Sequence, residues 1–127
     1  NRSYGLQRVI WSGRTPFEIR TMEARPDGFR CTFTKPIQRD SAAAATWRVQ
    51  SYTYEYRSEY GGPEIDAKEL AVKVGAVSAD GLTVDLQVEN LRPYFVHELN
   101  IDGLKSADGE PLVHAVAYYT LNKIPAR

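Results

Sequence analysis

The stretch DGLTVDLQVE, residues 80–89, indicates the fold class most directly. It begins with Asp-Gly, a dipeptide typical of tight hairpin turns. The residues that follow alternate between apolar and polar side chains, and the apolar ones are Leu82, Val84, Leu86 and Val88. Because successive side chains of a strand point to opposite faces, this pattern predicts a strand with one buried face. Residues 70–77 are predicted to pair with it in an antiparallel hairpin.

Similar segments, separated by turn residues, recur along the whole chain. They lie at 17–24, 29–35, 47–60, 95–101 and 113–121. No segment shows a sustained 3.6-residue apolar period, and only residues 40–45 predict a short helix, with Asp40 or Ser41 as its N-cap. The sequence therefore predicts an all-β, immunoglobulin- or fibronectin III-like sandwich of about seven antiparallel strands.

Length and composition predict one domain. The chain has 127 residues, of which 43% are hydrophobic and 25% are charged, as in ordinary globular domains. We expect residues 15–124 to form the sandwich, residues 1–14 to be a linker or the end of a preceding domain, and residues 125–127 to be a tail. The chain opens at Asn1 with neither methionine nor a leader pattern, so we expect a segment of a longer protein.

The charge balance and the rarity of metal-ligating residues argue against several functions. Sixteen basic residues balance sixteen acidic ones, so no net field attracts a nucleic acid. The longest apolar run, residues 42–45, is far shorter than the ~20 residues of a membrane span. One cysteine and two histidines are too few for haem attachment or a zinc site, and we expect no cofactor and no metal.

The cysteine and the two histidines are predicted to have structural roles. Cys31 shares a strand face with Phe29 and Phe33, so it is expected to pack in the core. His97 is in phase with the apolar residues of its segment, so we expect it to point toward the core or its edge, as a hydrogen-bonded group at the base of a strand. His114 is expected to be exposed or to act as a cap. No nucleophile motif accompanies either histidine, and we predict no catalytic residue and no enzyme.

A row of tyrosines is the least generic feature of the sequence. Trp47 and Val49 alternate in one phase, whereas the tyrosines at 52, 54 and 56 alternate in the other, which implies a bulge near residues 50–51 or a row on the opposite face. Exposed tyrosines could stack on sugar rings or on a partner protein, whereas covered ones would only reflect strand propensity. The candidate ligand-binding residues are Tyr52, Tyr54, Tyr56 and Tyr60.

The segment after the tyrosines is predicted to be a loop. Residues 58–69 contain Gly-Gly-Pro and four carboxylates, which are Glu59, Glu64, Asp66 and Glu69. Several carboxylates in one loop could bind calcium, but the spacing of an EF-hand is missing.

The second half of the chain resembles bacterial Ig-like domains related to fibronectin type III. The matching residues are Asp80–Val84, Leu91-Arg92-Pro93, His97-Glu98-Leu99, Gly103–Ser106 and Gly109–Leu112. In those domains a tyrosine stands four positions after the proline. Here His97 stands at that corner position.

Most of the chain also resembles a module of large secreted proteins of planctomycete-type bacteria. The matching residues are Gly5–Val9, Thr15–Ile19, Pro26–Phe29, Tyr60–Asp66 and Tyr118–Asn122. In those proteins the module accompanies a glucose/sorbosone dehydrogenase-like β-propeller and often a c-type cytochrome domain. The resemblance implies a secreted or periplasmic multidomain protein and carries over no catalytic residue, because the oxidation and the haem belong to the other domains.

These observations lead to one expected function and one alternative. We expect a non-catalytic structural or interdomain module of a secreted multidomain bacterial protein, with the neighbouring domains of the same polypeptide as partners. The alternative is a carbohydrate-binding module that uses exposed tyrosines.

Overall fold

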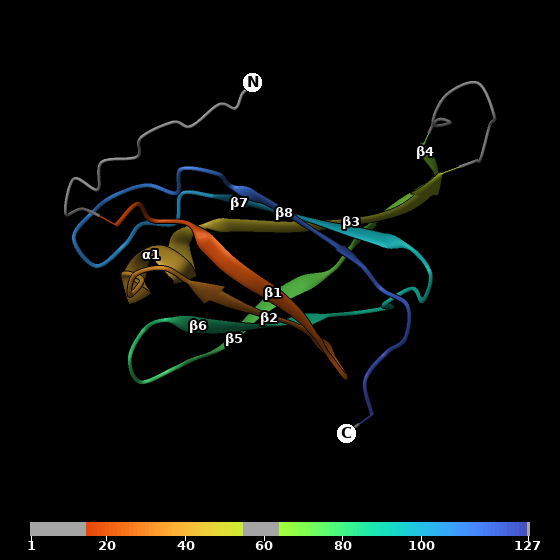
Figure 1. The fold of residues 1–127 in the computed structure, drawn as a ribbon, viewed down its shortest axis with the longest axis horizontal. Helices are drawn as coiled ribbons and strands as arrows, with labels where there is room; N and C mark the ends of the chain where they lie inside the picture. The colour runs from red at the N-terminus through yellow and green to blue at the C-terminus, as the bar shows by residue number, and fades with distance from the viewer. Residues whose placement is uncertain (1–14, 55–63, 127) are drawn as a thin grey trace, which may run out of the picture.

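The computed structural model describes residues 15–54 and 64–126, which form a β-sandwich (Figure 1). Within these ranges eight strands make two four-stranded sheets in which every neighbouring pair is antiparallel. The first sheet has the order β1 (Ile19–Arg25), β2 (Gly28–Phe33), β6 (Thr83–Val88), β5 (Val72–Val77). The second has the order β4 (Glu64–Leu70), β3 (Thr46–Tyr54), β7 (Val96–Asp102), β8 (Val116–Thr120).

The strand order confirms the predicted fold class. In chain order the first sheet reads as the ABED sheet of an immunoglobulin domain, and β3, β7 and β8 read as its CFG sheet, with β4 added at the edge. Each described edge strand therefore pairs on one side only.

Alternation places the core between the sheets. Phe29, Cys31 and Phe33 point inward from β2 and are at most 1% exposed. They oppose the apolar phase of β6, because Phe29 pairs with Leu86 and Cys31 pairs with Val84. The predicted hairpin of residues 70–77 and 82–89 is present as β5 and β6. Val49, Leu99 and Ile101 close the core from the second sheet.

Two local predictions were wrong. Residues 64–69, predicted as part of a loop, lie in β4, which pairs with β3 across a register shift between Ser51 and Thr53. The helix α1 (Arg39–Ala44) is one residue out of the predicted place, and its N-cap is Gln38, which makes no side-chain cap bond. Ser41 lies inside the helix, where its hydroxyl donates to the Gln38 carbonyl over 2.8 Å. None of the described helices has the length and apolar character that crossing a bilayer requires.

The described chain enters at one end of the sandwich and leaves toward the other. We call the end that holds residue 15 the N-terminal pole; it also holds the connection from β7 to β8, residues 103–115. The opposite pole holds the connection from β6 to β7, and the chain leaves on that side after β8 (Figure 1).

Candidate functional site

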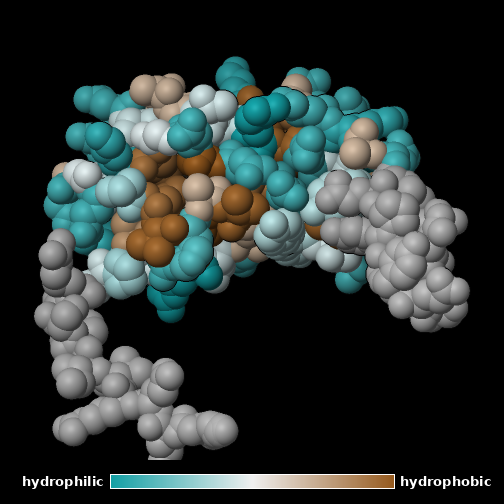
Figure 2. Space-filling model, turned by 90° about the horizontal axis from the view of Figure 1, so that it is seen from above, coloured by the Kyte–Doolittle hydropathy of each residue, from teal (hydrophilic) through white to brown (hydrophobic). Residues whose placement is uncertain are grey.

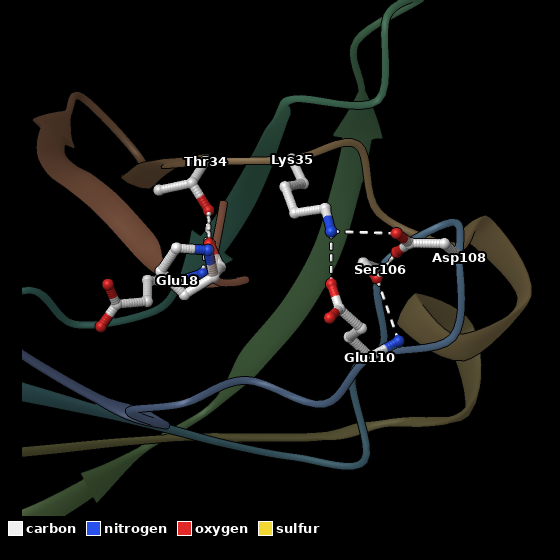
Figure 3. Close-up of polar contacts among 7 residues, drawn as sticks. Glu18, Thr34, Lys35, Ser106, Asp108 and Glu110 are labelled. Carbon is white, nitrogen blue, oxygen red and sulfur yellow. Dashed lines mark hydrogen bonds and ion pairs between the residues drawn. The ribbon is translucent and has the colours of Figure 1, made fainter. Parts of the chain in front are cut away.

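Thr34 ties down the chain at the N-terminal pole. Its hydroxyl donates to the Pro16 carbonyl over 2.6 Å and accepts the Glu18 amide over 3.0 Å (Figure 3). The Glu18 carbonyl in turn accepts the Thr34 amide, and the Phe17 carbonyl accepts the amide of Val113 from the β7–β8 connection, both over 3.0 Å. The first described residues are therefore bonded to the segment that follows β2 and to the β7–β8 connection.

A polar cluster shapes the neighbouring loop. Lys35 lies in a carboxylate pair: its ammonium donates to Asp108 over 2.9 Å and to Glu110 (Figure 3). These two hydrogen bonds raise the pKa of Lys35, whereas the hydroxyl of Ser106, and then Lys35, lower the pKa of Asp108. Ser106 is fully buried, and its hydroxyl accepts the Glu110 amide over 3.0 Å. The cluster holds residues 105–111 against the residues that follow β2.

The same pole presents hydrophobic surface beside these polar groups. Pro16, Phe17, Pro111 and Val113 line a shallow depression there, and Val113 is 58% exposed. Figure 2 shows hydrophobic surface gathered in the left half of the molecule, the half that holds this pole, with hydrophilic surface around it. A mixed surface of this kind at a chain end is suited to contact with a neighbouring domain.

His97 lies at the other end of the second sheet, where the predicted hydrogen-bonded role is confirmed and, of core and edge, the structure shows the core. It is fully buried, its Nδ1 lies 3.1 Å from the Phe95 carbonyl, and its Nε2 accepts the Arg92 amide over 3.3 Å. Because the carbonyl requires a donor and the amide requires an acceptor, the ring is neutral and carries its proton on Nδ1. The imidazole thus makes the bond back to the upstream backbone that a corner tyrosine makes in related sandwiches.

The surroundings of His97 do not form a catalytic arrangement. Ser51 stands directly opposite His97, and both side chains are 0% exposed. The Ser51 hydroxyl has no partner among the described atoms, while both ring nitrogens of His97 are engaged by the backbone. Neither residue lines a described depression of the surface. Both side chains are thus enclosed by the described residues around them.

The other predicted structural residues are where the sequence placed them. Cys31 is fully buried, and burial raises the pKa of its thiol to about 12. His114 is exposed, and its Nδ1 lies 2.7 Å from a carboxylate oxygen of Glu18. Within the described ranges no group of three or more His, Cys, Asp or Glu side chains is arranged to hold a metal ion.

Of the four candidate tyrosines, only Tyr52 has a described side chain. It is 2% exposed, and its hydroxyl donates to Glu98 over 3.0 Å, so its ring face is not available for stacking on a sugar. It lies opposite Val96 on the outward phase of β3, as the shifted tyrosine phase predicts. Tyr56 and Tyr60 lie outside the described residues, as does the side chain of Tyr54. Carbohydrate binding by those three residues stays a prediction.

The carboxylates of the predicted calcium loop serve other contacts. Asp66 lies in β4 and pairs with Arg92, and Glu69 pairs with Arg48 over 3.0 Å. Glu59 and the side chain of Glu64 lie outside the described residues. Because arginines neutralise both described carboxylates, they are poor candidates for a calcium site.

Sequence reasoning missed two features: β4 with its Arg92 contacts, and the pole that holds Lys35. Arg92 Nη1 donates to the carbonyls of Asp66 over 2.7 Å and Ser51 over 3.2 Å. Its guanidinium also lies 3.8 Å above the centre of the Phe95 ring. No local pattern signals such contacts, since the partners are 26 and 41 residues away from Arg92.

Comparison with solved structures places the fold among domains of bacterial surface-layer proteins. The chain is similar to part of the crystal structure of the S-layer protein rSbsC(31-844), with a TM-score of 0.63 and 21% identity over 88% of this chain. It is also similar to part of the structure of surface layer protein SbsC, domains 1-6, with a TM-score of 0.64 and 21% identity over 90% of this chain. The N-terminal part of the bacterial S-layer protein SbsC gives a TM-score of 0.61, also at 21% identity.

These similarities concern one portion of much longer chains. This chain spans 14% of the first of those structures, 15% of the second and 25% of the third. At this identity they establish a shared fold. No family model and no characterised protein sequence matches the chain. The resemblance to the planctomycete-type module therefore stays a prediction.

Proposed function

We propose that this chain is a non-catalytic structural module of a larger bacterial cell-surface or secreted protein, and that its N-terminal pole packs against the domain before it. The observation that carries the proposal is the match of nearly the whole chain to a single portion of longer surface-layer proteins. One of those structures comprises domains 1-6 of its protein, so the matched portion belongs to a multidomain chain. The sandwich fold by itself does not specify a function.

The N-terminal pole supports the interdomain part of the proposal. Thr34, Val113 and the loop held by Lys35 fix the backbone on which Pro16 and Pro111 are displayed. A rigid surface loses little conformational entropy when a neighbour docks on it. The exposed side chain of Val113 supplies apolar area to this surface.

The test compares the chain alone with the chain linked to the domain that precedes it in its parent protein. We expect the linked domain to raise the melting temperature of this module, and Val113→Lys to remove the increase while leaving the chain alone unchanged. Tyr94→Lys is the matched control, because Tyr94 is 78% exposed at the opposite pole. Equal melting temperatures with and without the preceding domain, or an equal loss in both variants, would refute the docking.

A further inference from the structure

The edge strand β8 differs from the other described edge strands in lacking charge. Edge strands of natural sheets are normally protected by charged residues, bulges or prolines, because their free backbone groups can pair with another chain. β1 carries Arg20, Glu23 and Arg25, β4 carries charges along its length, and β5 carries Lys73. The sequence of β8 is VAYYT, with no charged residue.

The pairing of β8 is also regular, whereas each of the other edges is irregular. Register shifts interrupt β1 beside β2, β4 beside β3 and β5 beside β6. The pairing of β8 with β7 runs without a shift from Val116 to Thr120. A bulge twists an edge away from a new partner, and β8 has none within its described pairing.

The hydrogen bonds at the ends of β8 show which backbone groups face outward. The Ala115 carbonyl accepts the amide of Ile101, and the Leu121 amide donates to the carbonyl of Phe95. Odd-numbered residues are therefore bonded to β7, and because antiparallel ladders alternate, the amides and carbonyls of Val116, Tyr118 and Thr120 point to the open edge. The side chains of the same three residues are exposed, that of Tyr118 to 64%.

The carboxylate nearest to Tyr118 on the sheet, that of Glu98, is hydrogen-bonded to residues of β3 and β7. Glu98 stands directly opposite Tyr118 on β7, on the same face of the sheet. One of its carboxylate oxygens accepts the hydroxyl of Tyr52 from β3, the strand on the far side, and the other accepts the side-chain amide of Asn100, each over 3.0 Å. The outer surface beside β8 thus presents the side chains of Tyr118 and Val116. The Glu98 carboxylate next to them is hydrogen-bonded on the side away from the edge.

We propose that β8 is a self-association edge, at which a second copy of this chain adds its own β8 antiparallel. In the two-fold pairing Tyr118 stands opposite Tyr118 of the second copy, and Val116 stands opposite Thr120, which allows about six backbone hydrogen bonds. A second copy fits because like charges opposite each other destabilise a sheet, and an uncharged strand is the edge that can meet itself without that cost. The inference is independent of the proposed packing at the N-terminal pole, which uses other residues.

Sedimentation velocity of the full chain over a range of concentrations tests this pairing. We expect a concentration-dependent monomer–dimer equilibrium, weakened at least about tenfold by either Tyr118→Lys or Tyr118→Glu. An equimolar mixture of these two variants should form a heterodimer, because the two-fold register places the new opposite charges face to face. Thr21→Lys, an exposed site on β1, is the control that should leave association unchanged.

Hydrogen exchange supplies a second readout. The amides of Val116, Tyr118 and Thr120 should gain protection as concentration rises, whereas those of Ala117 and Tyr119 should already be protected in the monomer. A chain that stays monomeric, association undiminished in folded Tyr118→Lys, or a lysine–glutamate mixture that does not associate would each overturn the proposal. Circular dichroism melts establish that every variant is folded.

Discussion

At the scale of single residues, His97 combines burial with two backbone contacts that require the neutral ring. Burial lowers its pKa, and the guanidinium of Arg92 lowers it further, while the bond to the Phe95 carbonyl acts in the opposite sense. Protonation would turn Nε2 into a donor facing the Arg92 amide, which is also a donor. The corner is therefore built to hold a neutral imidazole.

We predict that the free energy of unfolding decreases as the pH is lowered, because of the His97 side chain. The unfolded chain binds a proton on His97 near the ordinary pKa of about 6.5, whereas the folded chain resists it, so the contribution is present above that pH and is lost below it. Between pH 7 and pH 5 the free energy of unfolding should drop with a slope of at most about 1.4 kcal/mol per pH unit.

Urea unfolding at several pH values measures this slope. His97→Gln should flatten it, and His97→Tyr, which restores a corner hydroxyl, is a second variant that lacks the titrating ring. His114→Gln, at the other histidine of the chain, is the comparison variant, since the side chain of His114 is exposed. An unchanged slope in both His97 variants would show that another group titrates.

At the scale of elements, Arg92 holds β4 to the rest of the second sheet. Asp66 has a positive φ of 55° at the irregular part of β4, a conformation that costs energy outside glycine. The fork of Arg92 bonds both the carbonyl and the carboxylate of Asp66, and also the Ser51 carbonyl of β3. One side chain from the β6–β7 connection thus fixes the outermost strand.

Replacing the Arg92 guanidinium should lower the free energy of unfolding by more than the loss of one exposed ion pair would. Arg92→Lys keeps the charge but cannot bond several oxygens in one plane or lie flat on Phe95, so we expect a loss of about 1–3 kcal/mol in the free energy of unfolding. Arg48→Lys is the matched control, since its pair with Glu69 is more than half exposed on both sides and should lose about 0.5 kcal/mol or less. Equal losses in urea titrations would contradict the bridging role.

At the scale of the whole molecule, the two poles hold different structural features. At the N-terminal pole the first described residues are bonded to Thr34, which follows β2, and to Val113 of the β7–β8 connection. The opposite pole holds the His97 corner and the end of β8 (Figure 1). A domain with its chain ends directed to different poles can be placed in series with others, as the proposed function requires.

Thr34→Val tests the anchor at the N-terminal pole. Valine has the shape of threonine but lacks the hydroxyl, so the bonds to the Pro16 carbonyl and the Glu18 amide are both lost. We expect a loss of about 1–2 kcal/mol in stability and faster hydrogen exchange at the Glu18 amide. Thr21→Val, at an exposed position of β1, should change neither quantity. Unchanged exchange at Glu18 would show that the hydroxyl does not anchor the chain.

Period-two patterns predicted most of the sandwich, and they failed where pairing depends on distant contacts. The alternation around Cys31 and Val84 placed both in the core, and the phase of His97 placed it among buried residues. β4 was missed because its charged sequence and the Gly-Gly-Pro before it are typical of loops, whereas β3 and Arg92 supply its bonds. The phase of Tyr52 was predictable, but its burial was not.

By itself the sequence determined the all-β class, the inward faces of the central strands and the structural nature of Cys31 and His97. These follow from side-chain alternation and apolar burial, which are local properties of a strand. Only the tertiary structure decided which strands lie at the edges, that β8 is the one described edge without charge, and that Thr34 and Arg92 bond distant segments. Those features depend on hydrogen bonds between segments far apart in the chain, and no local pattern encodes them.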